Sequence, residues 1–113
     1  MNQIDRLSAL LKQLATKAKQ IDKKNSVEKV HRLIENNNLF SPELFTSQSD
    51  RFSPYVEEVQ RKISELSRLL NAGKIELSTL SLERIEQQIS SISNALHANA
   101  ALHQAAKLSF DAH

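Results

Sequence analysis

The chain contains no cysteine or tryptophan, one glycine and two prolines in 113 residues. Without cysteine it can form no disulfide and offers no thiolate to a metal, which favours a reducing, intracellular compartment. With one glycine it has no glycine-rich loop to cradle a phosphate, and few turns are expected. These absences predict a single domain of long helices with a modest core.

Long apolar runs are also missing. The first residues, MNQIDRLSALLKQLATKAKQ, lack the uninterrupted apolar segment of a signal peptide. No window approaches the roughly 18 apolar residues of a membrane-spanning helix. The sequence therefore predicts a cytoplasmic protein without a membrane partner.

The apolar residues that are present repeat at steps of three and four, which is the spacing of one helix face. Three such stripes predict three long helices, with apolar positions at Ile4, Leu7, Leu11, Leu14, Ala18 and Ile21; at Phe52, Val56, Val59, Ile63, Leu66 and Leu70; and at Leu82, Ile85, Ile89, Ile92 and Leu96. We predict an all-α fold, an antiparallel helical bundle of three long helices plus one short helix and a short aromatic helical turn.

Polar residues and proline mark the first boundaries. The first helix should run from about Gln3 to Ile21, with a break from Asp22 to Asn25. Ser26 can cap the short helix, which the run of three asparagines at 36–38 should end. The pair Ser41-Pro42 reads as a cap followed by proline and should open a helical turn that ends at Phe45.

The second half carries similar signals. Ser53-Pro54 repeats the helix-start pattern, and Gly73 is well placed just after a helix end. We predict a connector over Lys74–Leu80, with Ile75 and Leu77 pointing inward, before the last helix begins near residues 78–82. Beyond Leu96 the stripe weakens to alanines, and the last roughly ten residues are expected to fray.

Few residues are candidates for chemistry. Glu28-x-x-His31 has the spacing of one half of a di-iron site, but no second Glu-x-x-His exists. The other glutamates of the long helices lie off the apolar stripes, at Glu57, Glu58, Glu65, Glu83 and Glu86. His97 and His103 are six residues apart, which does not suit a shared metal. We predict no catalytic residue, no metal site and no cofactor.

Charge is divided unevenly along the chain. Residues 1–32 carry eight basic and three acidic side chains, a net +5, whereas residues 33–113 carry seven and ten, a net −3. Five lysines dominate the basic part, at Lys12, Lys17, Lys19, Lys23 and Lys24. They are candidates for binding nucleic-acid phosphates or an acidic partner, and a merely solvated helix face is the simpler alternative. No aromatic residues are interleaved with them, so binding of single-stranded DNA should be weak.

An aromatic segment precedes the second long helix. Its side chains at Phe40, Leu44, Phe45, Phe52 and Tyr55 could form a binding pocket or a plug on the core. The pattern favours the core.

The same segment carries a resemblance. Leu39-Phe40-x-x-x-Leu44-Phe45, Phe52-x-x-Tyr55-Val56-x-Glu58 and Ile63-x-x-Leu66 look like the N-terminal region of the bacterial primosomal replication protein N'' (PriC) family. Leu82-Glu83-Arg84-Ile85-x-x-Gln88-Ile89 with Ala95-Leu96 resembles the family's next helix. The likeness covers about Val30 to Leu96. It implies a mainly structural role for Phe40, Leu44, Phe45, Phe52, Tyr55 and Glu58.

The resemblance also implies a function. Members of that family restart replication at stalled forks, bind single-stranded DNA and the tail of the single-stranded-DNA-binding protein, and promote loading of the replicative helicase. We therefore expect a non-catalytic adaptor in the bacterial cytoplasm, associated with the nucleoid at forks. Family members are longer and have a basic C-terminal region, so residues 1–113 are expected to form one helical-bundle domain, the N-terminal domain of a longer protein.

One alternative stays open at this point. A structural helical adaptor or a secretion-type chaperone would use its grooves for protein helices and have no role with nucleic acid. Salt separates the two hypotheses, because lysine-driven DNA binding weakens steeply as salt rises.

Overall fold

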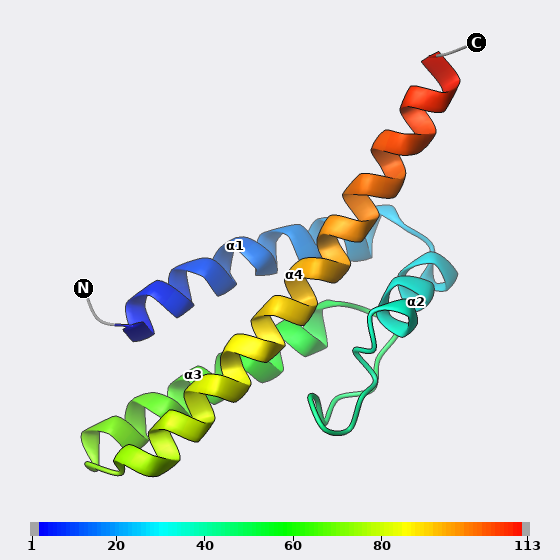
Figure 1. The fold of residues 1–113 in the computed structure, drawn as a ribbon. Coiled ribbons are helices and arrows are strands. Elements are labelled where there is room, and N and C mark those ends of the chain that lie inside the picture. Colours follow the sequence, from blue (N-terminus) through cyan, green and yellow to red (C-terminus); the bar gives the residue numbers. More distant parts are fainter. Residues whose placement is uncertain (1–2, 112–113) are drawn as a thin grey trace.

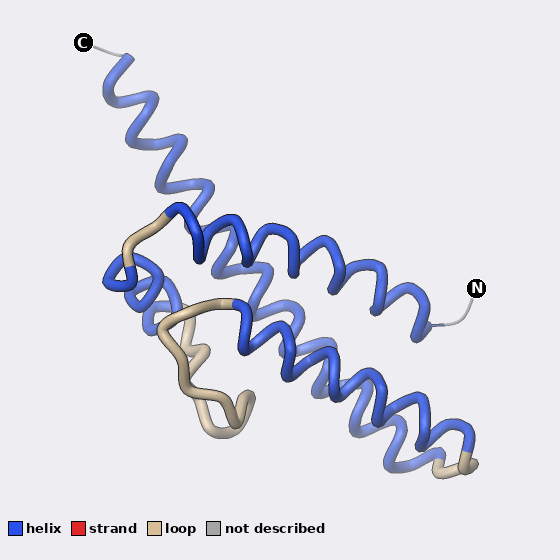
Figure 2. Tube along the Cα trace, turned by 180° about the vertical axis from the view of Figure 1, so that it is seen from behind, coloured by secondary structure: helices blue, strands red, loops and turns tan. Residues whose placement is uncertain are grey.

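The computed structural model describes the backbone of residues 3–111 and the side chains of residues 3–97. It contains four helices, α1 (Gln3–Lys24), α2 (Val27–Asn36), α3 (Ser53–Asn71) and α4 (Ile75–Asp111) (Figure 1). The described residues form no strand (Figure 2). The predicted all-α class, with three long helices and one short one, is confirmed.

The helices α3 and α4 form an antiparallel hairpin, and α1 packs along it in the direction opposite to α3 (Figure 1). The short helix α2 contacts both α1 and α4, and the irregular segment 37–52 returns the chain from α2 to the start of α3 (Figure 1). No helix in the described part of the chain combines the length and apolar character needed to cross a bilayer.

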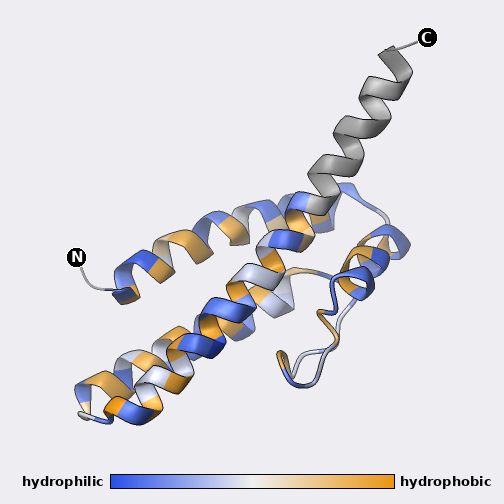
Figure 3. Ribbon diagram, viewed as in Figure 1, coloured by the Kyte–Doolittle hydropathy of each residue, from blue (hydrophilic) through white to orange (hydrophobic). Residues whose placement is uncertain are grey.

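The apolar stripes predicted from the sequence form the core. In α1 the side chains of Leu7, Leu11, Leu14 and Ala18 are buried, and α4 buries Ile85, Ile89, Ile92 and Leu96. Figure 3 shows hydrophobic and hydrophilic residues alternating along the coloured part of each helix, as expected of amphipathic helices. The core also includes the irregular segment, through Leu39, Phe45 and Phe52.

The boundaries around α2 follow the predicted signals, with one difference. The Ser26 hydroxyl accepts a hydrogen bond from the Lys29 amide at 3.2 Å, and the helix ends where Asn38 adopts a positive φ of 58°. However, α1 continues through Asp22 to Lys24, so the predicted break is later and shorter. The turn predicted after Ser41 is present as a single hydrogen-bonded turn, closed by the Phe45 amide on the Ser41 carbonyl at 2.9 Å.

The predicted connector after Gly73 is wrong. Only three residues separate the end of α3 from the start of α4 at Ile75, so Ile75 and Leu77 belong to a helix and do not point inward. Their exposed fractions are 75% and 51%, and Leu70, the last residue of the α3 stripe, is 49% exposed. These residues lie at the turn between α3 and α4, where no neighbouring helix fully covers their side chains.

The backbone of α4 is helical to Asp111. Side chains after His97, and the whole of residues 112–113, lie outside the described residues. The fraying expected for the last residues, and the single-domain organisation, stay predictions.

Gly73 ends α3 as predicted, in a left-handed conformation with φ 73°. The amides of Gly73 and Lys74 donate to the carbonyls of Leu70 and Leu69 at 3.1 and 3.0 Å, which closes the helix end. An added Cβ would meet no atom within 4 Å, so only backbone strain opposes a side chain here.

We expect Gly73→Ala to lower the free energy of unfolding by about 1 kcal/mol, because alanine tolerates this conformation poorly. Gly73→Asn should recover part of the loss, since asparagine adopts left-handed conformations more readily. Urea denaturation followed by circular dichroism measures both variants. Equal stability of Gly73→Ala and the wild type would show that the turn relaxes into another conformation.

Candidate functional site

The five lysines of the predicted binding surface all lie on α1 and are all exposed. Successive helical residues are about 100° apart, so Lys12, Lys19 and Lys23 share one flank of the helix. Lys17 and Lys24 lie on the opposite flank, across the buried stripe. The lysines therefore form two basic edges, and the structure does not bring all five together.

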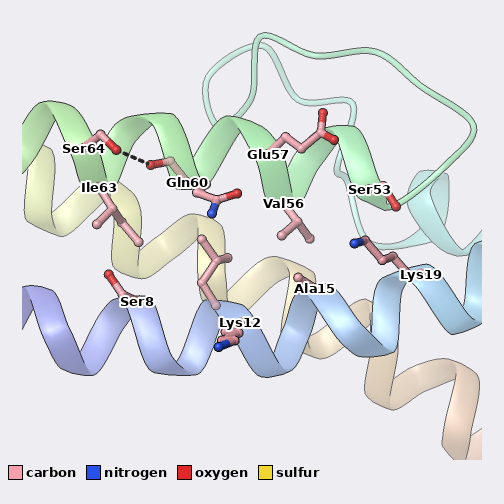
Figure 4. Close-up of a pocket in the computed structure, with 11 residues that line it drawn as sticks. Ser8, Lys12, Ala15, Lys19, Ser53, Val56, Glu57, Gln60, Ile63 and Ser64 are labelled. Atoms are coloured by element: carbon pink, nitrogen blue, oxygen red, sulfur yellow. Dashed lines mark hydrogen bonds between the residues drawn. The ribbon is translucent and has the colours of Figure 1, made fainter.

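The first of these edges borders a groove. Between α1 and α3 lies a groove of about 570 Å³ with Lys12 and Lys19 among the residues that line it (Figure 4). The apolar side chains that line it are Leu11, Ala15, Val56 and Ile63, and the polar ones from α3 include Ser53, Gln60 and Ser64. Figure 4 shows Lys19 reaching toward Ser53, while the carboxylate of Glu57 points away from α1. The groove thus joins apolar surface to a positively charged edge.

Asp22 fixes this edge against α3. Its carboxylate accepts hydrogen bonds from the amides of Phe52 and Ser53 at 2.8 and 3.0 Å, and from the Ser53 hydroxyl at 2.7 Å. It caps α3 from another helix, so the predicted cap at Ser53 is wrong, and Ser53 is the first helical residue. In return, the Arg51 guanidinium donates to the carbonyl of Asp22 at 2.8 Å. The end of α1 and the start of α3 therefore hold each other in place.

The role of Asp22 was not predicted from the sequence. One signal was available, because an acidic residue near the C-terminal end of a helix opposes the helix dipole. Asp22 lies among four lysines close to the C-terminal end of α1, which implies that its carboxylate interacts with another part of the chain.

The aromatic segment lies in the core. Phe45, Phe52 and Tyr55 are at most 1% exposed, while Phe40 and Leu44 are half-buried. The rings of Phe45 and Tyr55 meet edge to face, with centroids 5.2 Å apart and an interplanar angle of 86°. The described aromatic residues therefore form a plug on the bundle, and the alternative of an open aromatic pocket is not supported.

The polar end of Tyr55 is also satisfied. Its hydroxyl accepts from the Ser49 amide at 3.0 Å and donates to the Ser49 carbonyl at 3.1 Å. Burial raises the pKa of Tyr55 above its ordinary value, outweighing the hydrogen bond with Ser49, and the carboxylates of Asp50 and Glu58 act in the same direction as burial. The ring therefore stays neutral and anchors residue 49 to the core.

Glu58 is the second anchor of the irregular segment. Although it lies off the apolar stripe, it is 3% exposed, because residues 46 and 47 cover it. The amide and hydroxyl of Ser47 donate to its Oε1 at 2.7 Å each, and Thr46 donates through its amide at 3.0 Å and its hydroxyl at 3.0 Å. Burial alone raises the pKa of a carboxyl group, but these donors outweigh it and lower the pKa of Glu58.

Gln88 completes this anchor from α4. The fully buried side chain donates through Nε2 to the Leu44 carbonyl at 2.7 Å and to Glu58 Oε2 at 3.4 Å. Arg84, one turn earlier, donates to the same carbonyl at 3.5 Å. The family-motif residue Glu58 and the two α4 residues therefore hold the aromatic segment on the bundle.

His31 does not pair with Glu28. Its Nδ1 meets Asp50, its Nε2 lies 3.6 Å from Glu35, and its ring packs against Phe40 at 5.3 Å. Among the residues whose side chains are described, no three histidine or carboxylate groups are arranged to hold a metal. The His103 side chain lies outside the described residues.

Comparison with known proteins identifies a family. The family model described as primosomal replication protein priC matches residues 5–112 of the chain. No curated protein and no solved structure matches. The match covers nearly the whole chain, including most of α1, which lies outside the stretch from Val30 to Leu96 that carries the resemblance.

Proposed function

This chain belongs to the primosomal replication protein priC family, and on that premise we propose that it is a non-catalytic adaptor that helps to reload the replicative helicase at stalled forks. The family places it among the accessory proteins of the primosome, which act in replication restart. The partners that we propose are the replicative helicase, the single-stranded-DNA-binding protein and, weakly, single-stranded DNA. Such partners imply a cytoplasmic protein.

The observation that carries the proposal is the basic edge of α1 beside the groove to α3. Lys12, Lys19 and Lys23 project from α1. The apolar stripe of this helix is buried, and its C-terminal end is held against α3 because Asp22 caps the start of α3. An acidic segment could therefore bind without any ordering of a loop, which lowers the entropic cost of association. The apolar residues that line the groove would add contacts for apolar side chains of the same segment.

The contribution of DNA should be the smaller one. Of the described aromatic side chains, Phe45, Phe52 and Tyr55 are buried and Phe40 is half-buried, so none forms an open platform for a base. Exposed lysines then act through the phosphates alone, without sequence preference. Protein docking is expected to supply most of the affinity.

We expect Lys12→Glu, Lys19→Glu and Lys23→Glu, combined, to weaken binding of a labelled single-stranded oligonucleotide on the order of tenfold or more at low salt. If each lysine neutralises one phosphate, the log–log salt slope should fall by about 2. Fluorescence anisotropy at low and physiological salt gives both quantities. The same variants are titrated with the single-stranded-DNA-binding protein and the helicase.

A matched control exists on the other flank of α1. Arg6→Glu, Lys17→Glu and Lys24→Glu, combined, make the same change in net charge away from the groove. If both triple variants lose DNA binding equally, only net charge matters and the groove has no special role. If no affinity changes in either variant while circular dichroism shows an intact fold, the lysines are solvated surface, and the helical adaptor without nucleic acid becomes the better hypothesis.

A further inference from the structure

A second groove runs between α3 and α4, and no residue of α1 lines it. It measures about 470 Å³ and extends from the turn of the hairpin to Glu43 in the irregular segment. Its apolar side chains are Leu69 of α3 and Leu77 and Leu80 of α4. Leu77 and Leu80 are three residues apart, so they lie on one side of α4, which is the usual arrangement of residues that pack against a neighbouring helix. Nevertheless they are 51% and 64% exposed.

The side chains that line this groove carry a net negative charge, whereas those of α1 are mainly basic. Three carboxylates line it, from Glu43, Glu65 and Glu83, against the two cations Lys62 and Arg84. Both cations have contacts within the chain: Lys62 lies 3.8 Å from Glu65, and Arg84 is half-buried and donates to the Leu44 carbonyl. Lys62 and Glu65 offset each other, whereas a carbonyl leaves the charge of Arg84 in place, so Glu43 and Glu83 outweigh a single half-buried cation and the groove carries a net charge of −1.

The negative charge of the groove indicates which kind of partner could bind there. A second copy of this chain, docked through the same groove about a two-fold axis, would bring carboxylates toward carboxylates. The basic helix α1 of a second copy does not fit either, because its apolar stripe is already buried in its own bundle. An apolar stripe with basic flanks would match the leucines and the rim together.

We propose that the groove between α3 and α4 docks an amphipathic helix of a partner protein, with apolar residues at i, i+3 or i+4 and i+7 against the three leucines and with lysine or arginine beside Glu43 and Glu83. This surface is separate from the basic edge of α1 and does not depend on the function proposed for that edge. With both surfaces in use, the bundle joins an acidic ligand on one side to a basic helix on the other.

The probe is a synthetic helix with leucines along one face, lysines on both flanks of that face and glutamine elsewhere. We expect it to bind the wild-type chain at micromolar concentrations by fluorescence anisotropy, and Leu77→Ser with Leu80→Ser to weaken binding at least tenfold. Glu43→Gln with Glu83→Gln should weaken it several-fold and reduce its dependence on salt. The control is Leu10→Ser, which removes an exposed leucine (42%) between α1 and α4 and should leave binding unchanged.

Four results would overturn the proposal. These are no binding of the probe to the wild type, an equal loss with Leu10→Ser, equal binding of a probe whose lysines are replaced by glutamate, and binding unchanged by the glutamine substitutions. Sedimentation of the wild type as a dimer that Leu77→Ser with Leu80→Ser dissociates would instead assign the groove to a second copy of the chain. Circular dichroism confirms that each variant is folded.

Discussion

Replacing Phe45 with alanine is expected to lower the free energy of unfolding by about 3–5 kcal/mol. The ring is 1% exposed and packs edge to face on Tyr55, so its removal leaves a cavity between the irregular segment and α3. Neighbouring groups cannot collapse freely into that cavity, because Glu58 and Gln88 hold the segment on both sides of Phe45. Urea denaturation at neutral pH measures the change.

Phe40→Ala is the matched control. It removes the same ring from the same segment, but Phe40 is half-buried and lies farther from Tyr55, with centroids 6.4 Å apart. Its cost should be clearly smaller than that of Phe45→Ala. A cost below about 1 kcal/mol for Phe45→Ala would contradict the structure and make Phe45 part of a binding surface.

Much of the bundle could be predicted because helix periodicity reports which face is buried. Leu7, Leu11 and Leu14 repeat at the spacing of a helix contact and lie in the core, as do Ile85 and Ile89. The pattern needs no knowledge of the partner, since any neighbouring helix covers such a stripe in the same way.

Apolar residues do not indicate burial at the end of a helix, where no neighbouring helix covers them. Leu70 continues the α3 stripe at helical spacing, and Ile75 and Leu77 were expected to point inward from a connector, yet all three are exposed at the turn of the hairpin. Hydrophobicity indicated burial, and only the relative positions of the helices show that little covers them. Exposed leucines of this kind are where a docking surface can be sought.

Polar contacts between distant segments were the least predictable part. The Asp22 carboxylate binds amides 30 and 31 residues away, and Glu58 binds donors 11 and 12 residues before it. Such partners depend on the folded path of the chain. The candidate lysines were found from charge alone, and periodicity places them on two flanks, but the groove beside Lys12 and Lys19 exists only once α1 packs on α3.

Glu58→Gln is expected to cost about 2 kcal/mol at neutral pH, because an amide cannot accept all the hydrogen bonds that Thr46 and Ser47 donate to the carboxylate. The effect should depend on pH. The pKa of Glu58 is lowered in the folded state, so the ionised group stabilises the fold fully above its unfolded pKa and loses that contribution as the pH falls through the folded value. The difference between the wild type and Glu58→Gln should therefore shrink in acid.

Glu57→Gln provides the control, since it removes a neighbouring but exposed carboxylate from the same turn of α3. Its stability should stay within about 0.5 kcal/mol of the wild type across the same pH range. Denaturation curves from neutral pH down through the range of carboxyl titration distinguish the two variants. If the difference between the wild type and Glu58→Gln stays constant or grows in acid, the carboxylate is not the form that holds residues 46 and 47, and the anchor must rest on Gln88 and its bond to the Leu44 carbonyl.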